Sequence, residues 1–234
     1  RPSATNNNTA GAGLQNAALA SGGGNPPNAA CKCTEHYNGT AWSAGGAMNL
    51  GRQSHGHTGT EYAALIGGGK NTGQTPLDTV EEYYGSTWAT GGALGTARYQ
   101  LSFAGTQDAA VSIGGYTFPA GTALTCVEHY NGTAWSAGGA INTARYSAAA
   151  AGTQNAAVYF GGTTGPHLKH TEEYDGTSWT IVNDMIVATS QNMAAGTQNA
   201  ALSMGKQQGA DTQEYNGFQW KSGPNLINAR GIGA

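Results

Sequence analysis

The chain has 234 residues, of which 10% are Asp, Glu, Lys or Arg, and its formal net charge is −3. Ordinary globular domains carry about 25% charged residues, while Gly, with 38 residues, has about double its usual share here. Ten basic residues provide no positively charged surface for a nucleic acid, and no apolar run approaches the roughly 20 residues of a membrane-spanning helix. We therefore predict neither a nucleic-acid partner nor insertion into a membrane.

The aromatic residues indicate that the chain is built of repeats. A Tyr precedes each Trp by five residues, and the two are joined by a turn-forming segment such as YNGTAW or YDGTSW. The tryptophans are Trp42, Trp88, Trp135, Trp179 and Trp220, and the tyrosines are Tyr37, Tyr83, Tyr130, Tyr174 and Tyr215. Successive tryptophans are 46, 47, 44 and 41 residues apart. A period of about 40–50 residues is typical of repeat architectures, so we predict five repeats.

Each repeat is predicted to contain four short strands. The segment AGTQNAA, or a near copy, leads into a strand such as Asn155–Phe160, which a Gly pair ends in four of the five repeats. A strand such as Thr34–Tyr37 and one starting near Thr40 follow, joined by an Asn-Gly or Asp-Gly pair. That pair favours a two-residue hairpin turn with positive φ at both positions. The stretch around Arg145–Ala149 supplies the fourth strand, and four antiparallel strands at this period are typical of a β-propeller blade.

The Gly pair, the Tyr, the Trp and the Arg, in this order and at these spacings, resemble a kelch repeat. The resemblance runs from about Ala10 to Arg230, and the variant GTQNAA…GG…EEYDGTSW…GG…NTAR is similar to kelch-like repeats in structural proteins of marine bacteriophages and environmental bacteria. It implies an all-β fold, a five-bladed kelch-like β-propeller with four antiparallel strands per blade. We expect a single propeller domain over residues 10–234 after an N-terminal extension of residues 1–9, with repeats at about 10–52, 53–98, 99–145, 146–189 and 190–234.

The two ends of the chain bear on how the ring closes. Kelch propellers usually have more blades than five, so the chain forms either a five-bladed ring or a part of a longer protein. The segment Arg230–Ala234 resembles the opening strand of a repeat, and we expect it to add a strand to the first blade and close the ring. Arg1–Ala4 competes for the same place, because it resembles Arg145–Ala148.

Two kinds of charged residue recur at fixed positions in the repeats. Ten residues after the Trp comes an Arg in four copies, and two residues before the Tyr comes a Glu in four copies. These residues are Arg52, Arg98, Arg145, Arg230, Glu35, Glu81, Glu128 and Glu172. A charge that recurs at one strand position indicates architecture rather than chemistry, so we predict an Arg–Glu ion pair inside each blade or between neighbouring blades. The recurring Tyr and Trp are predicted to pack between the blades.

One loop in each repeat varies in length and composition. From the second position of the Gly pair to the Tyr, the intervals are 14, 14, 15, 12 and 9 residues, while the other spacings are constant. In a propeller these five loops lie on one face, and variable loops on a fixed scaffold are where binding sites are found. We predict a binding face that includes the aromatic residues Tyr116 and Phe118, the polar group His167, Lys169 and His170, and Asp78 and Asp211 as acceptors for sugar hydroxyls. The alternative is that these loops are variable solvent-exposed segments without a ligand.

The chain offers few residues for catalysis or metal binding. Cys31, Cys33 and Cys126 are too few for a disulfide framework or a zinc site, and we predict that they are free thiols. His55-Gly56-His57 is at most a weak metal motif, and no Lys-Ser or Lys-Thr follows the Gly pairs as it would in a phosphate loop. No Ser lies in a recognisable nucleophile turn. We predict that the protein is not an enzyme and has no metal or other cofactor.

Two classes of function remain. The first is a non-catalytic structural or adhesive module of a bacteriophage particle, in a tail, fibre or capsid-surface protein, that binds a partner protein or a host surface through the variable loops. The second is a secreted or cell-surface lectin. The resemblance and the low charge favour the first class, which implies a location on the virion surface or outside the cell. The partners would be other virion proteins or host-surface glycans.

Overall fold

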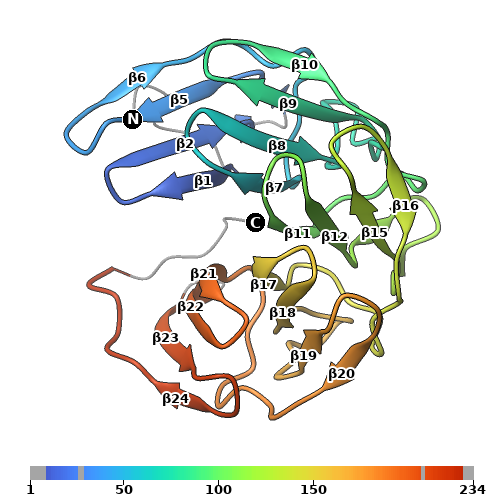
Figure 1. Ribbon diagram of the computed structural model, residues 1–234, viewed down its shortest axis with the longest axis vertical. Helices are drawn as coiled ribbons and strands as arrows, with labels where there is room; N and C mark the ends of the chain where they lie inside the picture. Colours follow the sequence, from blue (N-terminus) through green and yellow to red (C-terminus); the bar gives the residue numbers. More distant parts are fainter. Residues whose placement is uncertain (1–8, 26–28, 207–208, 229–234) are drawn as a thin grey trace.

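The computed structural model describes residues 9–25, 29–206 and 209–228. These residues form five four-stranded antiparallel sheets arranged around a common axis as the blades of a β-propeller (Figure 1). The described ranges contain strands and no helix, and therefore no helix that could cross a membrane. The predicted all-β fold with five blades of four strands is confirmed.

The first three blades follow one another along the chain. Blade one consists of β1 (Ala10–Leu14), β2 (Ala17–Ser21), β5 (Thr34–Tyr37) and β6 (Trp42–Ala44). Blade two consists of β7 (Gly56–Gly59), β8 (Ala63–Gly67), β9 (Val80–Tyr84) and β10 (Trp88–Thr90). Blade three consists of β11 (Ser102–Gly105), β12 (Ala110–Ile113), β15 (Val127–Tyr130) and β16 (Trp135–Ala137).

The last two blades have the same strand order. Blade four consists of β17 (Ala149–Thr153), β18 (Ala156–Phe160), β19 (Thr171–Tyr174) and β20 (Trp179–Ile181). Blade five consists of β21 (Met193–Thr197), β22 (Ala200–Lys206), β23 (Gly209–Tyr215) and β24 (Trp220–Ser222). Two short hairpins, β3 (Gly24–Asn25) with β4 (Ala29–Ala30) and β13 (Tyr116–Thr117) with β14 (Thr122–Ala123), lie in the variable loops of blades one and three.

The first strand of each blade faces the axis, and β1, β7, β11, β17 and β21 pack side by side in that order. Small residues make this close approach possible. A Cβ atom added to Gly56 of β7 would lie only 2.6 Å from the ring of Phe103 on β11. The abundance of Gly and Ala in the first strands therefore follows from packing, because larger side chains would push these strands apart.

The first blade has four strands from residues 10–44, with β1 as its innermost strand. The segment Arg230–Ala234, which we expected to close the ring, lies outside the described residues, as does Arg1–Ala4. Strands β1 and β21 do not pack on each other as the other neighbouring first strands do, and Figure 1 shows their ribbons apart. Met193 on β21 is exposed, whereas the equivalent residues of β7 and β17, Gly56 and Ala149, are buried.

The hairpin between the third and fourth strands differs from the prediction. Tyr37 pairs with Trp42, so the loop has four residues, Asn38–Ala41, rather than two. Only the Gly is left-handed, with φ of 90° at Gly39. The Asn38 side-chain oxygen accepts hydrogen bonds from the backbone N–H groups of Thr40 and Ala41, at 3.0 and 2.9 Å. This side-chain cap stabilises the loop without a positive φ at the Asn, which is why the two-residue turn is wrong.

Three of the four predicted strand positions agree with the structure to within two residues, and one is wrong. Thr34–Tyr37 is strand β5, the strand expected near Thr40 is β6 and begins at Trp42, and β18 begins one residue after the start of the predicted range Asn155–Phe160. The predicted strand around Arg145–Ala149 is wrong, because β17 begins only at Ala149 and the four residues before it form the link between two blades. In that link Ser147 has a φ of 53°, which interrupts an extended conformation.

At three of the links between blades, one buried ion pair fixes the link to the blade that follows it. Arg52 contacts Glu81 at 2.7 Å and Arg98 contacts Glu128 at 3.0 Å. The third pair is Arg145 with Glu172. All three arginine side chains are fully buried, and burial lowers the pKa of Arg52 while Glu81 opposes that shift. The predicted Arg–Glu pair is observed at these three links.

The remaining two positions of the series differ. In blade five Gln213 replaces the Glu, and its side-chain oxygen accepts hydrogen bonds from the backbone N–H groups of Ile186 and Val187, at 2.8 and 3.1 Å. A neutral amide therefore holds the link that has Thr189 in place of the Arg. Arg230 lies outside the described residues, and Glu35 is buried in blade one.

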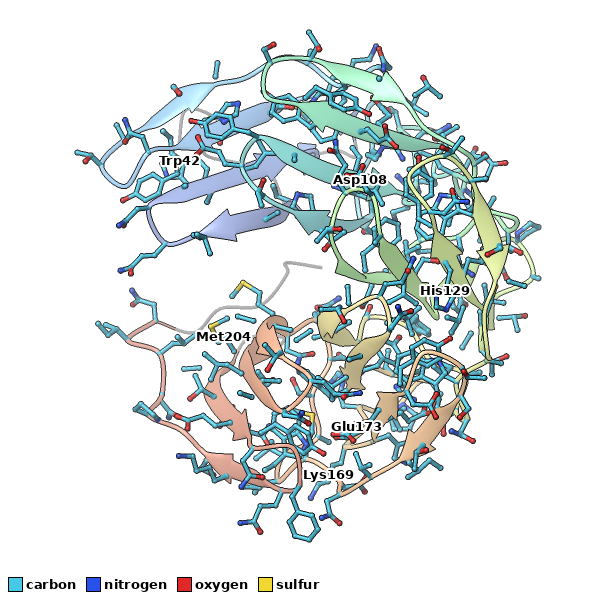
Figure 2. All side chains as sticks on the ribbon, viewed as in Figure 1. Trp42, Asp108, His129, Lys169, Glu173 and Met204 are labelled. Atoms are coloured by element: carbon cyan, nitrogen blue, oxygen red, sulfur yellow. A yellow bond between two sulfur atoms is a disulfide. The ribbon has the colours of Figure 1, made fainter. Side chains whose placement is uncertain are left out.

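The recurring aromatic residues lie at the boundaries between neighbouring blades, which we call seams. Four clusters of buried apolar side chains each join two neighbouring blades. The hydroxyl of the repeat Tyr binds a His or Glu of the preceding blade, and Figure 2 shows two of these partners, His129 and Glu173. These pairs are Tyr83–His36, Tyr130–Glu82, Tyr174–His129 and Tyr215–Glu173. The predicted packing of Tyr and Trp between the blades is therefore observed at these seams.

Candidate functional site

The propeller has two different faces. One carries the links between blades and the variable loops, and we call it the loop face; the other carries the short turns within blades, and we call it the turn face. On the loop face three links pair with the loop of the next blade, through Gln53 with Lys70, Tyr99 with Tyr116 and Tyr146 with Thr163. Tyr99 and Tyr116 exchange backbone hydrogen bonds of 3.1 and 2.9 Å, and Tyr146 and Thr163 do the same at 3.2 and 2.9 Å. The links and the variable loops therefore form one continuous surface.

Three tyrosines form a row on the loop face. The rings of Tyr99 and Tyr116 are 5.6 Å apart and meet edge to face, and those of Tyr116 and Tyr146 are 4.6 Å apart. The Lys70 ammonium lies 5.3 Å from the centre of the Tyr99 ring. Burial, with smaller contributions from the two neighbouring tyrosines, raises the pKa of Tyr99. The row therefore offers neutral aromatic surface to a ligand.

These tyrosines line a hollow of about 410 Å³, which is within the usual size range of ligand pockets. Its other lining residues come from the links and the loop of blade four; they are Gln100, Ser147, Thr163, Gly165, His167, Ser190 and Gln191. The Ser190 hydroxyl lies 2.8 Å from Nδ1 of His167. No carboxylate is among the residues that line the hollow, so its chemistry is aromatic and neutral polar with one imidazole.

Toward the axis the hollow adjoins a cavity of about 60 Å³ between the links. Ser54, Gln100, Ser147 and Gln191 surround it, all with φ between 53° and 56°. Each N–H of the last three donates to the carbonyl of the equivalent residue in the preceding link, at 2.8 to 2.9 Å. The side-chain oxygen of Gln191 is buried and has no hydrogen-bond partner among the described residues. Buried polar atoms are normally satisfied, so this oxygen has an acceptor capacity that no described residue uses.

The structure brings together two of the seven predicted binding residues, Tyr116 and His167, in this hollow. Phe118 belongs to the same loop as Tyr116 but is 60% exposed and does not line the hollow. Asp78, Lys169, His170 and Asp211 lie just before or at the start of the third strand of their blades, and none of them lines it either. The sequence showed which loops vary but not which way their side chains point.

The link residues Tyr99, Tyr146, Ser190 and Gln191 were missed as candidates. The first three directly follow the Arg position of the repeat, where the five copies have Gln53, Tyr99, Tyr146, Ser190 and Gly231. The variation in residue type directly after the recurring Arg was the available signal. Variation in length does not reveal these residues, because the links have constant length and vary only in composition.

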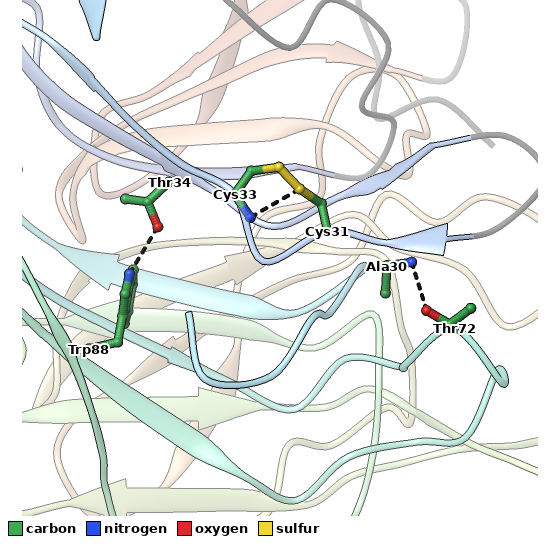
Figure 3. Close-up of a disulfide and its surroundings, with 6 residues drawn as sticks. All are labelled: Ala30, Cys31, Cys33, Thr34, Thr72 and Trp88. Carbon is green, nitrogen blue, oxygen red and sulfur yellow. Dashed lines mark hydrogen bonds between the residues drawn. A yellow bond between two sulfur atoms is a disulfide. The ribbon is translucent and has the colours of Figure 1, made fainter. Parts of the chain in front are cut away.

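The prediction of free thiols is wrong for two of the three cysteines. Cys31 and Cys33 form a disulfide with their Cα atoms 5.2 Å apart, within the usual range, and Cys126 is free (Figure 3). Hydrogen bonds on both sides tie this segment to blade two. They join Ala30 N–H to the Thr72 hydroxyl at 3.1 Å and the Trp88 indole to the Thr34 hydroxyl at 2.9 Å. The bend between β4 and β5 brings the two cysteines together, and spacing alone did not show it.

A thiol titration tests this disulfide. Protein unfolded in guanidinium chloride without reductant should react at one thiol per chain, from Cys126, and at all three after reduction. The variant Cys126→Ser should show no thiol before reduction. Three reactive thiols in unreduced wild-type protein would contradict the disulfide.

Among the described residues, no group of three or more His, Cys, Asp or Glu side chains is placed to hold a metal ion. No model of a known protein family matches the chain, and no curated protein matches it either. The assignment to a function therefore depends on the geometry of the loop face and on the repeat pattern.

Proposed function

We propose that this protein is a non-catalytic adhesive module of a bacteriophage particle that binds host-surface glycans through the hollow of the loop face. The observation that carries the proposal is the tyrosine-lined hollow with the unpaired Gln191 oxygen beside it. The resemblance of the repeats to kelch-like repeats of phage structural proteins supports the location. The three buried Arg–Glu pairs support the role of a rigid scaffold that presents the loops.

Binding fits this hollow better than catalysis. The His167–Ser190 pair is the nearest approach to a nucleophile and its base. Ser190 is buried, and no carboxylate among the lining residues could orient the imidazole. A hydrolytic site needs the nucleophile exposed to substrate and the base held by a third group. The described residues of the hollow do not form that arrangement.

An uncharged polyhydroxylated ligand matches the chemistry of the hollow. The half-buried tyrosine rings supply flat apolar faces. Gln100, Gln191 and His167 supply hydrogen-bond donors and acceptors, which suit hydroxyl groups. The same chemistry supports the second candidate, a secreted or cell-surface lectin, which differs in where the protein acts rather than in what it binds.

Glycan binding and its dependence on the tyrosines can be measured together. Wild-type protein should bind a subset of a glycan array. The double variant Tyr116→Ala/Tyr146→Ala should lose affinity by about 5- to 150-fold, since each of the two aromatic contacts contributes about 0.5–1.5 kcal/mol. Phe118→Ala is the matched control, because this exposed aromatic ring is in the same loop but outside the hollow. Unchanged binding in the double variant would reject the site, and no glycan binding by the wild type would reject the adhesive role.

The virion location has its own test. The genes next to the coding sequence should encode tail or capsid proteins, and mass spectrometry of purified particles should detect the chain. Neighbouring genes for secreted proteins without any virion gene would favour the lectin instead.

A further inference from the structure

Two consecutive residues of blade two depart from the repeat. At the position of Glu61 the other four copies have Gln15, Gln107, Gln154 and Gln198, and at the position of Tyr62 they have Asn16, Asp108, Asn155 and Asn199. In blades three to five the Gln amide donates two hydrogen bonds to backbone carbonyls of the preceding blade. A carboxylate cannot donate these bonds. Glu61 turns instead to His36 of blade one, whose Nδ1 lies 3.1 Å from its oxygen.

The altered residues form one cluster on the turn face of the seam between blades one and two. His36 Nε2 lies 2.7 Å from the Tyr83 hydroxyl, and the His36 ring stacks against Tyr62 with 5.7 Å between centres and 26° between planes. Glu61 and Tyr83 are buried, while Tyr62 is 62% exposed. A hydrogen bond with Glu61 raises the pKa of Tyr62, so its phenol stays neutral. The cluster therefore has a buried, hydrogen-bonded polar floor and one aromatic ring exposed to solvent.

A hollow of about 350 Å³ lies over this cluster. Asn38 and Ser43 of blade one and Ser86 of blade two line it together with the four cluster residues, and short Gly-containing segments complete its walls. A Cβ atom added to Gly45 would lie 2.9 Å from the His36 ring, so the absence of a side chain there keeps the space open. The size is within the range of small-molecule pockets.

The seam between blades three and four shows which of these features are structural. There His129 binds the Tyr174 hydroxyl at 2.8 Å, which corresponds to the His36–Tyr83 bond. Gln154 donates to the Ala110 and Tyr130 carbonyls, and Asn155 takes the place of the exposed tyrosine. The His–Tyr bond therefore belongs to the scaffold. Glu61 and Tyr62 are additions that the scaffold does not require.

We propose that this hollow binds a single uncharged sugar residue, at a site separate from the loop face. The apolar face of the sugar ring packs on Tyr62, and its hydroxyls bond to Glu61, Asn38 and the two serines. A carboxylate is a strong acceptor for hydroxyl groups. His36 Nδ1 lies 3.1 Å from one Glu61 oxygen, so part of this carboxylate is already bonded, and its remaining acceptor capacity suits the hydroxyls of a neutral ligand.

The test uses the double variant Tyr116→Ala/Tyr146→Ala, which weakens the loop-face hollow, so the two sites are distinguished. Saturation-transfer NMR with the methyl glycosides of glucose, galactose, mannose and N-acetylglucosamine should show contact with at least one of them. Weak binding with a Kd of about 1 mM corresponds to about 4 kcal/mol and is sufficient for this measurement. Adding Tyr62→Ala should abolish the signal. The control adds Phe218→Ala instead. This change removes an exposed aromatic ring between β23 and β24, away from the hollow, and should leave the signal unchanged.

Glu61→Gln provides a second variant that restores the residue of the other repeats. It should weaken sugar binding by about two- to thirtyfold, because a hydrogen bond to an ionised carboxylate is stronger than one to a neutral amide oxygen. The proposal is overturned if none of the glycosides shows contact, if Tyr62→Ala leaves the signal intact, or if methylguanidinium binds at Tyr62 more tightly than the glycosides do. Loss of the folded spectrum on Tyr62→Ala would also count against it, because an exposed ligand-binding ring is not needed for folding.

Discussion

Replacing Arg145 with alanine should lower the free energy of unfolding by about 3–5 kcal/mol, the usual cost of breaking a buried ion pair on one side. The Arg145 side chain is fully buried, binds Glu172, and donates to the Tyr159 carbonyl at 3.1 Å. Without it the Glu172 carboxylate keeps the donors of Asn142 but loses its counter-charge. Urea denaturation followed by tryptophan fluorescence measures the change.

The Glu172 carboxylate shows why the loss is large. Burial alone would raise the pKa of Glu172, but Arg145 and the hydrogen bonds from Asn142 outweigh it and lower the pKa below the ordinary value. Its ionised form therefore depends on the partner. A second substitution, Glu172→Gln, in the Arg145→Ala background should recover part of the lost stability, because it removes the unpaired charge.

Lys221→Ala is the matched control for the ion pair. Lys221 lies 2.8 Å from Glu214, but the two side chains are 71% and 41% exposed. An exposed pair contributes about 0–1 kcal/mol, so this variant should lose no more than that. If Arg145→Ala lost equally little, the Arg–Glu pairs would not be the elements that fix the links to the blades.

Acidification should destabilise the protein by about 3 kcal/mol between pH 6.5 and pH 4 through His57 alone, at about 1.4 kcal/mol per pH unit of pKa difference. Burial lowers the pKa of His57 from 6.5 to about 4, with a smaller opposing effect of the Gly11 backbone. Both ring nitrogens are buried and form no hydrogen bond of ordinary geometry among the described residues. Between pH 6.5 and pH 4 the unfolded chain binds a proton at His57 that the folded chain does not bind. The free energy of unfolding is therefore highest above pH 6.5 and decreases as the pH falls.

His55 also lowers the free energy of unfolding as the pH falls. Burial, the charge of Arg52 and the neighbouring His57 lower the pKa of His55 well below its usual value, and its Nε2 lies 3.4 Å from the Ser21 hydroxyl. Thermal melts between pH 4 and pH 8 would record the combined effect of both histidines. The transition temperature should decrease steadily as the pH falls below 6.5.

His57→Phe is the informative variant, because blade three has Phe103 at the same position of the repeat. It should remove about 3 kcal/mol of the acid-induced loss while the neutral protein stays folded. His167→Ala, at an exposed histidine on the loop face, should leave the pH profile unchanged. An identical pH dependence in wild type and His57→Phe would show that another group causes the acid sensitivity.

The candidate site was predictable only in part. Tyr116 and His167 were found because their loops vary in length, and the same criterion selected Phe118 and Lys169, which do not line the hollow. Tyr99 and Tyr146 belong to links of constant length, so length variation missed them. Their convergence depends on the bridges from Tyr99 to Tyr116 and from Tyr146 to Thr163, which pair two links with the loops of the next blades and form only when the blades assemble.

The amino-acid sequence by itself determined the number of blades, the strand content and the Arg–Glu pairing, because these follow from residues that recur with a constant period. Tertiary structure alone decided how the residues that differ between the repeats come together. It placed the Cys31–Cys33 bond, the row from Tyr99 to Tyr146, and the Glu61–Tyr62 cluster. The physical reason is that a repeat specifies its own strands through local pattern, whereas a binding surface joins side chains of different blades. Their distances are set only by the packing of one blade on the next.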